Sequence, residues 1–160
     1  SERLGIPLPA EAAARLGAYL TLLERWNRAY NLTAVRDPEA MVVRHVLDSL
    51  SILPWLEGPR VLDVGSGAGL PGIPLAIARP EQGFCLLDSN GKRTRFLTQV
   101  AAELRLGNVA VVRGRVEDYR PEILFDSVVS RAFSTLADMV ADAGRLCAPE
   151  GRLLAMKGVS

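Results

Sequence analysis

Residues 61–72, with the sequence VLDVGSGAGLPG, constrain the fold of this chain more than any other segment. They predict an apolar strand that ends in an acidic residue, then a glycine-rich turn and the start of a helix. The next apolar run, residues 84–87, ends at Asp88. This pattern is typical of a nucleoside pocket at the carboxyl edge of a parallel sheet. The glycines let the backbone pass close to the ligand, and the second acidic residue meets ribose hydroxyls.

The spacing of the glycines fits two classes of cofactor. Counted from Gly67, residues 67–72 match the G-x-G-x-x-G pattern of dinucleotide-binding proteins. Counted from Gly65, they read G-x-G-x-G with Asp63 two residues earlier, which is the pattern of S-adenosylmethionine (SAM) methyltransferases.

Local chemistry favours SAM over a dinucleotide. A pyrophosphate needs free N–H groups at the start of the next helix, and Pro71 and Pro74 remove donors there. The Asp63 carboxylate attracts a sulfonium and an amino group but repels a pyrophosphate. We therefore expect SAM as the cofactor. The glycines expected to contact it are Gly65, Gly67 and Gly69.

Length and composition predict one domain. The 160 residues, 49% of them hydrophobic, are enough to bury one core. We expect a single domain over 1–160, with a helical extension at 1–58 and the sheet-containing core at 59–160. The net charge of +1 neither favours nor excludes an acidic partner. Basic residues are nevertheless in excess between residues 91 and 120, which suggests phosphate in the substrate, although each alone is as readily a solvated surface charge. They are Lys92, Arg93, Arg95, Arg105, Arg113, Arg115 and Arg120.

The two cysteines predict neither a metal site nor a disulfide. Cys85 and Cys147 lie in apolar contexts, far apart and without metal-ligand spacing. They are typical of free thiols in a reducing compartment. The chain shows no signal-peptide pattern and no apolar run of membrane-spanning length. We expect a cytoplasmic protein with no metal and no membrane partner.

The order of predicted elements indicates an α/β fold. Two amphipathic helices, at residues 9–30 and from Asp37 to Leu50, precede the sheet. Beyond them, short apolar strands alternate with helices, which is typical of a doubly wound, mostly parallel, Rossmann-like sheet. Strands are expected at 61–64, 84–87, 108–112, 127–129 and 151–156, and helices at 73–78, 92–106 and 136–146. A class I SAM methyltransferase sheet usually adds a helix and an antiparallel hairpin after the fifth strand. Because an uncovered edge is a liability, we expect that C-terminal edge to be missing from this chain.

Six stretches together resemble one enzyme family. They are WNRAYNLT at 26–33, RHVLDS at 44–49, LPGIP at 70–74, LDSNGKR at 87–93, SRA at 130–132 and AMKG at 155–158. The combination is similar to the bacterial small-subunit ribosomal RNA (guanine-N7)-methyltransferases of the RsmG/GidB type. The resemblance spans residues 10–158. It implies SAM as cofactor and 16S ribosomal RNA or the small ribosomal subunit as partner.

The resemblance also implies a set of cofactor contacts. They are Gly65, Leu70, Val116, Glu117 and Arg131. The residues alone support most of these, since Val116 and Glu117 follow the third strand, where an adenine can meet an apolar wall and polar groups. Without the resemblance, Glu117 would be interpreted as a surface charge at a helix start. Asp88 is expected to bind the ribose hydroxyls.

The expected reaction requires no general base. N7 of guanine already carries a free lone pair, so catalysis consists of aligning N7 with the methyl group and excluding water. Arg131 is the candidate catalytic residue because it follows the fourth strand, at the crevice where ligands bind. An ion pair with Asp88 or Glu117 is the alternative interpretation.

Four further polar residues are expected to bind substrate at the mouth of the pocket. Lys157 ends the fifth strand and can hold phosphate, unless it is a simple surface lysine. Asn31 is typical of a helix end. His45 and Asp48, three residues apart, could pair on a helix surface.

Three other functions remain open from the sequence. A SAM enzyme for small molecules would bind a free metabolite and show no salt-dependent affinity for RNA. An NAD-dependent oxidoreductase would bind NAD in place of SAM. A non-enzymatic assembly factor would bind SAM and ribosomal particles but would not methylate ribosomal RNA.

Overall fold

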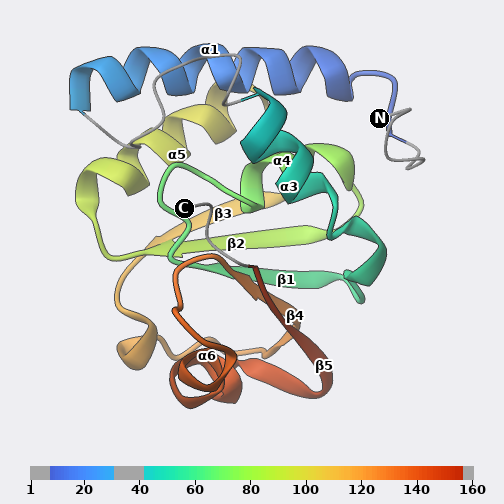
Figure 1. Cartoon of the computed structure of the whole chain (residues 1–160), viewed down its shortest axis with the longest axis vertical. Coiled ribbons are helices and arrows are strands. Elements are labelled where there is room, and N and C mark those ends of the chain that lie inside the picture. The colour runs from blue at the N-terminus through green and yellow to red at the C-terminus, as the bar shows by residue number, and fades with distance from the viewer. Residues whose placement is uncertain (1–7, 31–41, 157–160) are drawn as a thin grey trace.

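The computed structural model describes residues 8–30 and 42–156. A five-stranded sheet in the order β3-β2-β1-β4-β5 lies at its centre, and every neighbouring pair of strands is parallel (Figure 1). The strands are β1 Arg60–Val64, β2 Gly83–Asp88, β3 Val109–Arg113, β4 Phe125–Ser130 and β5 Cys147–Ala155. The strand order reverses between β1 and β4, and in such sheets ligands bind at this switch point.

Helices cover both faces of the sheet. They are α1 Ala12–Tyr30, α3 Leu47–Leu50 after the π-helical turn η2 Val42–Val46, α4 Gly72–Ala78, α5 Gly91–Glu103 and α6 Leu136–Ala143. Figure 1 shows α1, α3, α4 and α5 on one side of the sheet and α6 on the other. Short 3₁₀ turns are η3 Leu53–Trp55, η4 Val116–Asp118 and η5 Gly144–Leu146. The predicted doubly wound parallel sheet is therefore confirmed.

The sheet separates two hydrophobic cores. Side chains alternate between the faces of a strand. In β2, Phe84 and Leu86 accordingly enter the core beneath α1, α4 and α5, whereas Cys85 and Leu87 enter the core beneath α6. This double burial explains why the strands are continuous apolar runs in the sequence.

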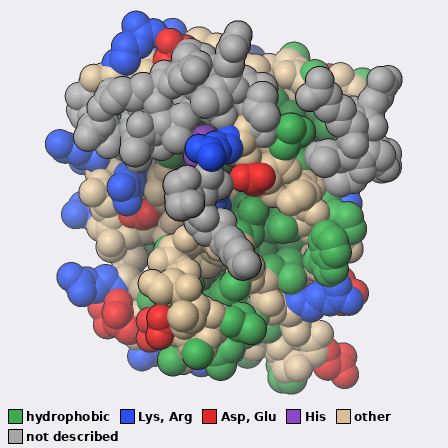
Figure 2. Space-filling model, viewed as in Figure 1, with side chains coloured by type: hydrophobic (Ala, Val, Ile, Leu, Met, Phe, Trp, Pro, Cys, Tyr) green, Lys and Arg blue, Asp and Glu red, His purple; other side chains and the backbone are tan. Residues whose placement is uncertain are grey.

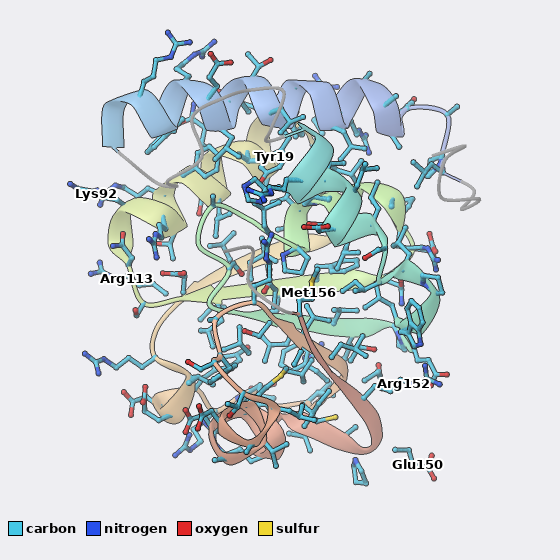
Figure 3. The ribbon with its side chains drawn as sticks, viewed as in Figure 1. Tyr19, Lys92, Arg113, Glu150, Arg152 and Met156 are labelled. Atoms are coloured by element: carbon cyan, nitrogen blue, oxygen red, sulfur yellow. The ribbon has the colours of Figure 1, made fainter. Side chains whose placement is uncertain are left out.

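The first helix is built into the larger core. Tyr19 and Leu23 of α1 have no exposed surface, and both belong to the same cluster as residues of α4 and α5. The Tyr19 hydroxyl donates a hydrogen bond of 2.7 Å to the Ala68 carbonyl in the glycine-rich turn. Figure 3 shows Tyr19 labelled between α1 and the sheet.

Several element boundaries differ from those predicted. The helix predicted to reach residue 106 ends at Glu103, because Arg105 takes a positive φ of 54° and Leu106 N–H bonds back to the Ala101 carbonyl, which closes the helix. The last predicted helix ends at Ala143 and continues as η5. The predicted start of the second helix, at Asp37, lies outside the described residues.

The outer strand β5 begins at Cys147, before the predicted start at 151, and pairs with β4 through a shift in register. Beside it, Trp55 of η3 and Leu136 of α6 are 55% and 56% exposed. Figure 2 shows hydrophobic side chains gathered on this part of the surface. Among the helices of the described segments, none is both long and apolar enough to cross a membrane.

Candidate functional site

A pocket of about 460 Å³ lies at the carboxyl ends of β1, β2 and β4, at the switch point of the sheet. Four of the predicted cofactor residues line it, namely Gly65, Asp88, Val116 and Glu117. Its size falls within the range of small-molecule and cofactor sites. A second cavity, of about 340 Å³, contacts Gly83 and Asn108 at the amino ends of the strands. The second cavity is therefore at the wrong edge of the sheet for a nucleotide-like ligand.

The glycine-rich turn has a backbone shape that only glycine adopts readily. Gly65, Gly67 and Gly69 have φ values of 70°, 58° and 99°. A Cβ atom on Gly65 would lie 2.6 Å from the Cβ of Ala132, in the loop after β4. The N–H groups of Gly65 and Ser66 both donate to the Leu87 carbonyl at the end of β2. The turn is thus held between two neighbouring strands.

Asp88 lines the pocket although only 6% of its surface is exposed. Its Oδ2 accepts a hydrogen bond of 2.8 Å from Gly67 N–H, and its Oδ1 accepts one of 2.8 Å from Asn90 N–H. Each carboxylate oxygen has a further lone pair. Asp88 therefore ties the turn to β2 and can still accept hydrogen bonds from a ribose.

The η4 turn carries Val116 and Glu117 to the opposite wall of the pocket. Arg145 of η5 donates from Nη2 to the Val116 carbonyl and from Nη1 to the Tyr119 carbonyl, the latter at 2.7 Å. Sequence analysis did not identify Arg145, because no motif marks it. Arg93 and Arg115 also line the pocket and add positive charge at its rim.

Leu70 and Gly69 contribute to the core beneath the turn. Leu70 is 8% exposed and belongs to the cluster that includes α1 and α4. A Cβ atom on Gly69 would lie 2.6 Å from Ile73. Both residues were predicted to contact the cofactor, and in the structure both pack against the core that supports the turn.

Asp63, the acidic residue before the glycines, is fully buried. Its Oδ2 accepts a 2.9 Å hydrogen bond from Gly72 N–H and so caps the start of α4. Its Oδ1 has no hydrogen-bond partner in the described part of the chain. Burial raises the pKa of Asp63 to about 7, against the opposing effect of the hydrogen bonds from Gly72 and Ser66. The structure therefore gives this residue a helix-capping role that the glycine pattern did not indicate.

His45 does not lie on the helix surface, where it could have paired with Asp48, because it is only 7% exposed. His45 lies in η2, directly before α3, and its imidazole is buried, with Nδ1 3.4 Å from Nη1 of Arg131. Arg131 follows β4, as predicted. Within the described residues it forms no ion pair with Asp88 or Glu117, which were its alternative partners.

The other predicted substrate residues are described only in part. Asp48 is half-buried in α3. Asn31 and Lys157 lie outside the described residues. Cys85 and Cys147 are free thiols. Over residues 8–30 and 42–156, no group of histidine, cysteine and acidic side chains is arranged to hold a metal ion.

Comparison with known proteins decides the family. The family described as "rRNA small subunit methyltransferase G" (GidB) matches residues 12–160. The chain belongs to the rRNA small subunit methyltransferase G family. Relatives of that name come from Alkalilimnicola ehrlichii, 62% identical over 98% of this chain and 71% of the relative, and from Nitrosococcus oceani, 61% identical over 97% and 72%. One from Pseudomonas aeruginosa is 59% identical over 99% of this chain and 75% of the relative.

Solved structures place the fold of this rRNA small subunit methyltransferase G family member among SAM-dependent methyltransferases. One from Thiobacillus denitrificans, in complex with S-adenosyl-L-homocysteine, has a TM-score of 0.56 and 23% identity over 70% of this chain and 47% of its own. A methyltransferase from Podospora anserina, also bound to S-adenosyl-L-homocysteine, has a TM-score of 0.59 and 16% identity over 94% and 71%. The predicted Rossmann-like methyltransferase fold is confirmed.

Proposed function

We propose that this protein transfers the methyl group of SAM to N7 of a specific guanine in the 16S ribosomal RNA of the small ribosomal subunit, in the cytoplasm. The observation that carries this proposal is the family match over residues 12–160. The pocket at the switch point supports it with a set of side chains suited to the cofactor.

The residues of the pocket fit SAM. The turn at Gly65 leaves room for a ligand backbone because a side chain is absent there. Asp88 accepts hydrogen bonds from the ribose hydroxyls, and Val116 contributes an apolar wall for the adenine while Glu117 contributes polar groups. The helix start beyond the turn has its first N–H, from Gly72, already bonded to Asp63. That arrangement suits a cofactor without a pyrophosphate better than a dinucleotide.

The chemistry needs alignment more than acid–base catalysis. When bound, SAM supplies a methyl group on a sulfonium, which the N7 lone pair takes as the C–S electron pair returns to sulfur. N7 loses no proton, so no side chain has to act as a general base. The protein's task is to place the guanine edge against the methyl group and to exclude water.

Arg131 is the residue proposed to provide this alignment. It lies in the loop after β4, and the next two residues, Ala132 and Phe133, line the pocket. Its guanidinium is a fixed fork of donors and always charged, so it can orient the guanine O6 or the cofactor. Asn31, Asp48 and Lys157 are proposed to contact the RNA at the mouth of the pocket.

Calorimetry tests the cofactor part of the proposal. S-adenosyl-L-homocysteine should bind to the purified protein and NAD should not. A Gly65→Val variant should lose this binding, because its side chain would collide with Ala132 and would have to take a positive φ. Gly17→Ala is the matched control, since a Cβ atom there meets nothing within 4 Å. Binding of NAD without binding of the SAM product would contradict the proposal.

A methylation assay tests the substrate part. Small-subunit rRNA is taken from cells that lack the gene, incubated with the protein and labelled SAM, and the modified base is mapped. A single N7-methylguanine supports the proposal. SAM binding without methylation would favour an assembly factor, and methyl transfer to free metabolites alone would favour a small-molecule enzyme.

A further inference from the structure

The side chain of Arg131 is held from a distant part of the chain. Its Nη1 lies 3.4 Å from Nδ1 of His45, which is 86 positions earlier in the sequence and belongs to η2. An arginine side chain can only donate a hydrogen bond, so Nδ1 of His45 must be the acceptor. His45 is therefore neutral in this contact and carries its proton on Nε2. In the described part of the chain Nε2 has no partner.

The backbone on either side of Arg131 is fixed, whereas its side chain depends on His45. The Ser130 hydroxyl donates 2.7 Å to the Val64 carbonyl, and Ala132 N–H donates 2.9 Å to that hydroxyl. The loop is thus anchored to β1 beside the pocket. An arginine side chain has several rotatable bonds, and an unrestrained guanidinium samples many positions. His45 is the contact that selects one of them.

The charges around His45 favour its neutral form. Burial lowers the pKa of His45, and the positive charges of Arg131 and Arg44 lower it further, while Asp48 raises it. Two buried groups on other elements face Arg131 itself. They are Tyr19 of α1 and Asp63 of β1. At neutral pH the imidazole therefore accepts a hydrogen bond from Arg131 and does not repel it.

We infer that His45 is a positioning residue for methyl transfer, and that its unprotonated Nδ1 holds the Arg131 guanidinium in the orientation needed at the reaction centre. This inference rests on the proposed function. Protonation of His45 removes the acceptor and places two cations 3.4 Å apart. Arg131 then turns away, so the rate falls on acidification through a pKa that lies below the ordinary histidine value of 6.5.

A spectroscopic experiment tests the contact without using activity. The chain contains one histidine, so imidazole NMR signals report on His45 alone. We expect the Nε2–H tautomer at pH 7 and a titration below the ordinary histidine range. In Arg131→Ala the pKa should move up. A proton on Nδ1, or a titration that does not change in Arg131→Ala, would overturn the inference even if the protein proved to act on another substrate.

A kinetic experiment tests the consequence for catalysis. His45→Leu removes the acceptor, whereas His45→Asn places an amide oxygen near the position of Nδ1. With small-subunit rRNA and saturating SAM, His45→Leu should lose about tenfold in kcat, as expected from misalignment of a reacting group. His45→Asn should keep most of the wild-type rate and lose the decline at acidic pH. Combining His45→Leu with Arg131→Ala should cost no more than Arg131→Ala alone.

Three outcomes distinguish the possibilities. An inactive wild type refutes the proposed function, and in that case the NMR experiment alone tests the contact between His45 and Arg131. Equal rates for wild type and His45→Leu over the whole pH range, or additive losses in the double variant, overturn the inference. A His45→Asn variant as impaired as His45→Leu, while folded, also overturns it and indicates proton transfer by His45. Ser49→Ala is the structural control, because it removes a 2.6 Å bond to the His45 carbonyl and should lower Tm without changing the pH profile.

Discussion

At the scale of single residues, Asp63 has the most unusual environment near the site. It is fully buried, one of its carboxylate oxygens caps α4, and no described group pairs with the other. Burial favours the protonated form of a carboxyl group, and for Asp63 this outweighs the opposing effect of the positive charge on Arg131. Burial accordingly raises the pKa of Asp63 from 3.8 to about 7.

This shift makes the stability of the protein depend on pH. The folded state holds the Asp63 proton at a pH where the unfolded chain has released it, so the free energy of unfolding falls as pH rises from about 4 to 7. We expect Asp63→Asn, which mimics the protonated form, to lose less stability over this range than the wild type. The difference should exceed about 1.4 kcal/mol, the equivalent of one pKa unit.

Denaturant unfolding of the ligand-free protein at pH 4, 5.5, 7 and 8 measures this difference. Asp138→Asn, at an exposed position on α6, is the control and should run parallel to the wild type. Parallel curves for Asp63→Asn and the wild type would show that Asp63 is ionised in the folded state.

At the scale of elements, one buried hydrogen bond connects α1 to the glycine-rich turn. Tyr19 has no exposed surface, and burial raises the pKa of its hydroxyl, which keeps it a donor to the Ala68 carbonyl. Tyr19→Phe leaves that carbonyl without its donor, which should cost about 1–3 kcal/mol. Thermal unfolding measures the cost. Tyr119→Phe, at a half-buried hydroxyl, should cost less, and equal losses would argue against the anchoring role.

The η4 turn is the second element held by side-chain hydrogen bonds to its backbone. Arg145 donates to the carbonyl of Val116 in the turn and to that of Tyr119 directly after it, Arg120 donates to the Glu117 carbonyl, and the turn forms one wall of the pocket. We expect Arg145→Ala to weaken binding of S-adenosyl-L-homocysteine about fivefold, because the ligand must then order the turn at a cost of about 1 kcal/mol. Calorimetry measures the affinity. Arg28→Ala, which breaks an exposed ion pair with Glu24 on α1, should leave it unchanged.

At the scale of the whole molecule, the distribution of charge predicts how RNA binds. Arg93 and Arg115 lie at the pocket, whereas Arg152 pairs with Glu57 at the amino end of the sheet. Figure 3 shows Lys92 and Arg113 on one side of the molecule and Arg152 on the other. The net charge of +1 gives no indication of this uneven distribution of arginines.

Affinity for the rRNA substrate should therefore fall with salt, because each phosphate contact releases a counterion. Arg93→Ala or Arg115→Ala should reduce the slope of log Kd against log salt concentration by about 0.7–0.9 each. Arg152→Ala should not change it. Filter binding between 50 and 200 mM salt gives the slopes, and identical slopes for all four proteins would place the RNA elsewhere.

The alternation of strands and helices, the glycine turn and the acidic end of β2 are local patterns, and local patterns were enough to predict the sheet and much of the pocket. Residues such as Gly65 and Asp88 could be identified because strand ends of a parallel sheet meet at one edge. Element boundaries were less predictable. The end of α5 depends on Arg105 taking a positive φ. Arginine rarely adopts this conformation, so the residue type gave no reason to predict it.

The sequence by itself determined the fold class, the edge of the sheet at which the site lies and the identity of the family. Only the tertiary structure decided which side chains support that site. His45 and Arg131 are 86 positions apart, and Arg145 is 29 positions from the carbonyl that it holds at Val116. Such contacts depend on how helices pack across the sheet. They leave no periodic or motif signal, because each requires one suitable residue at one distant position.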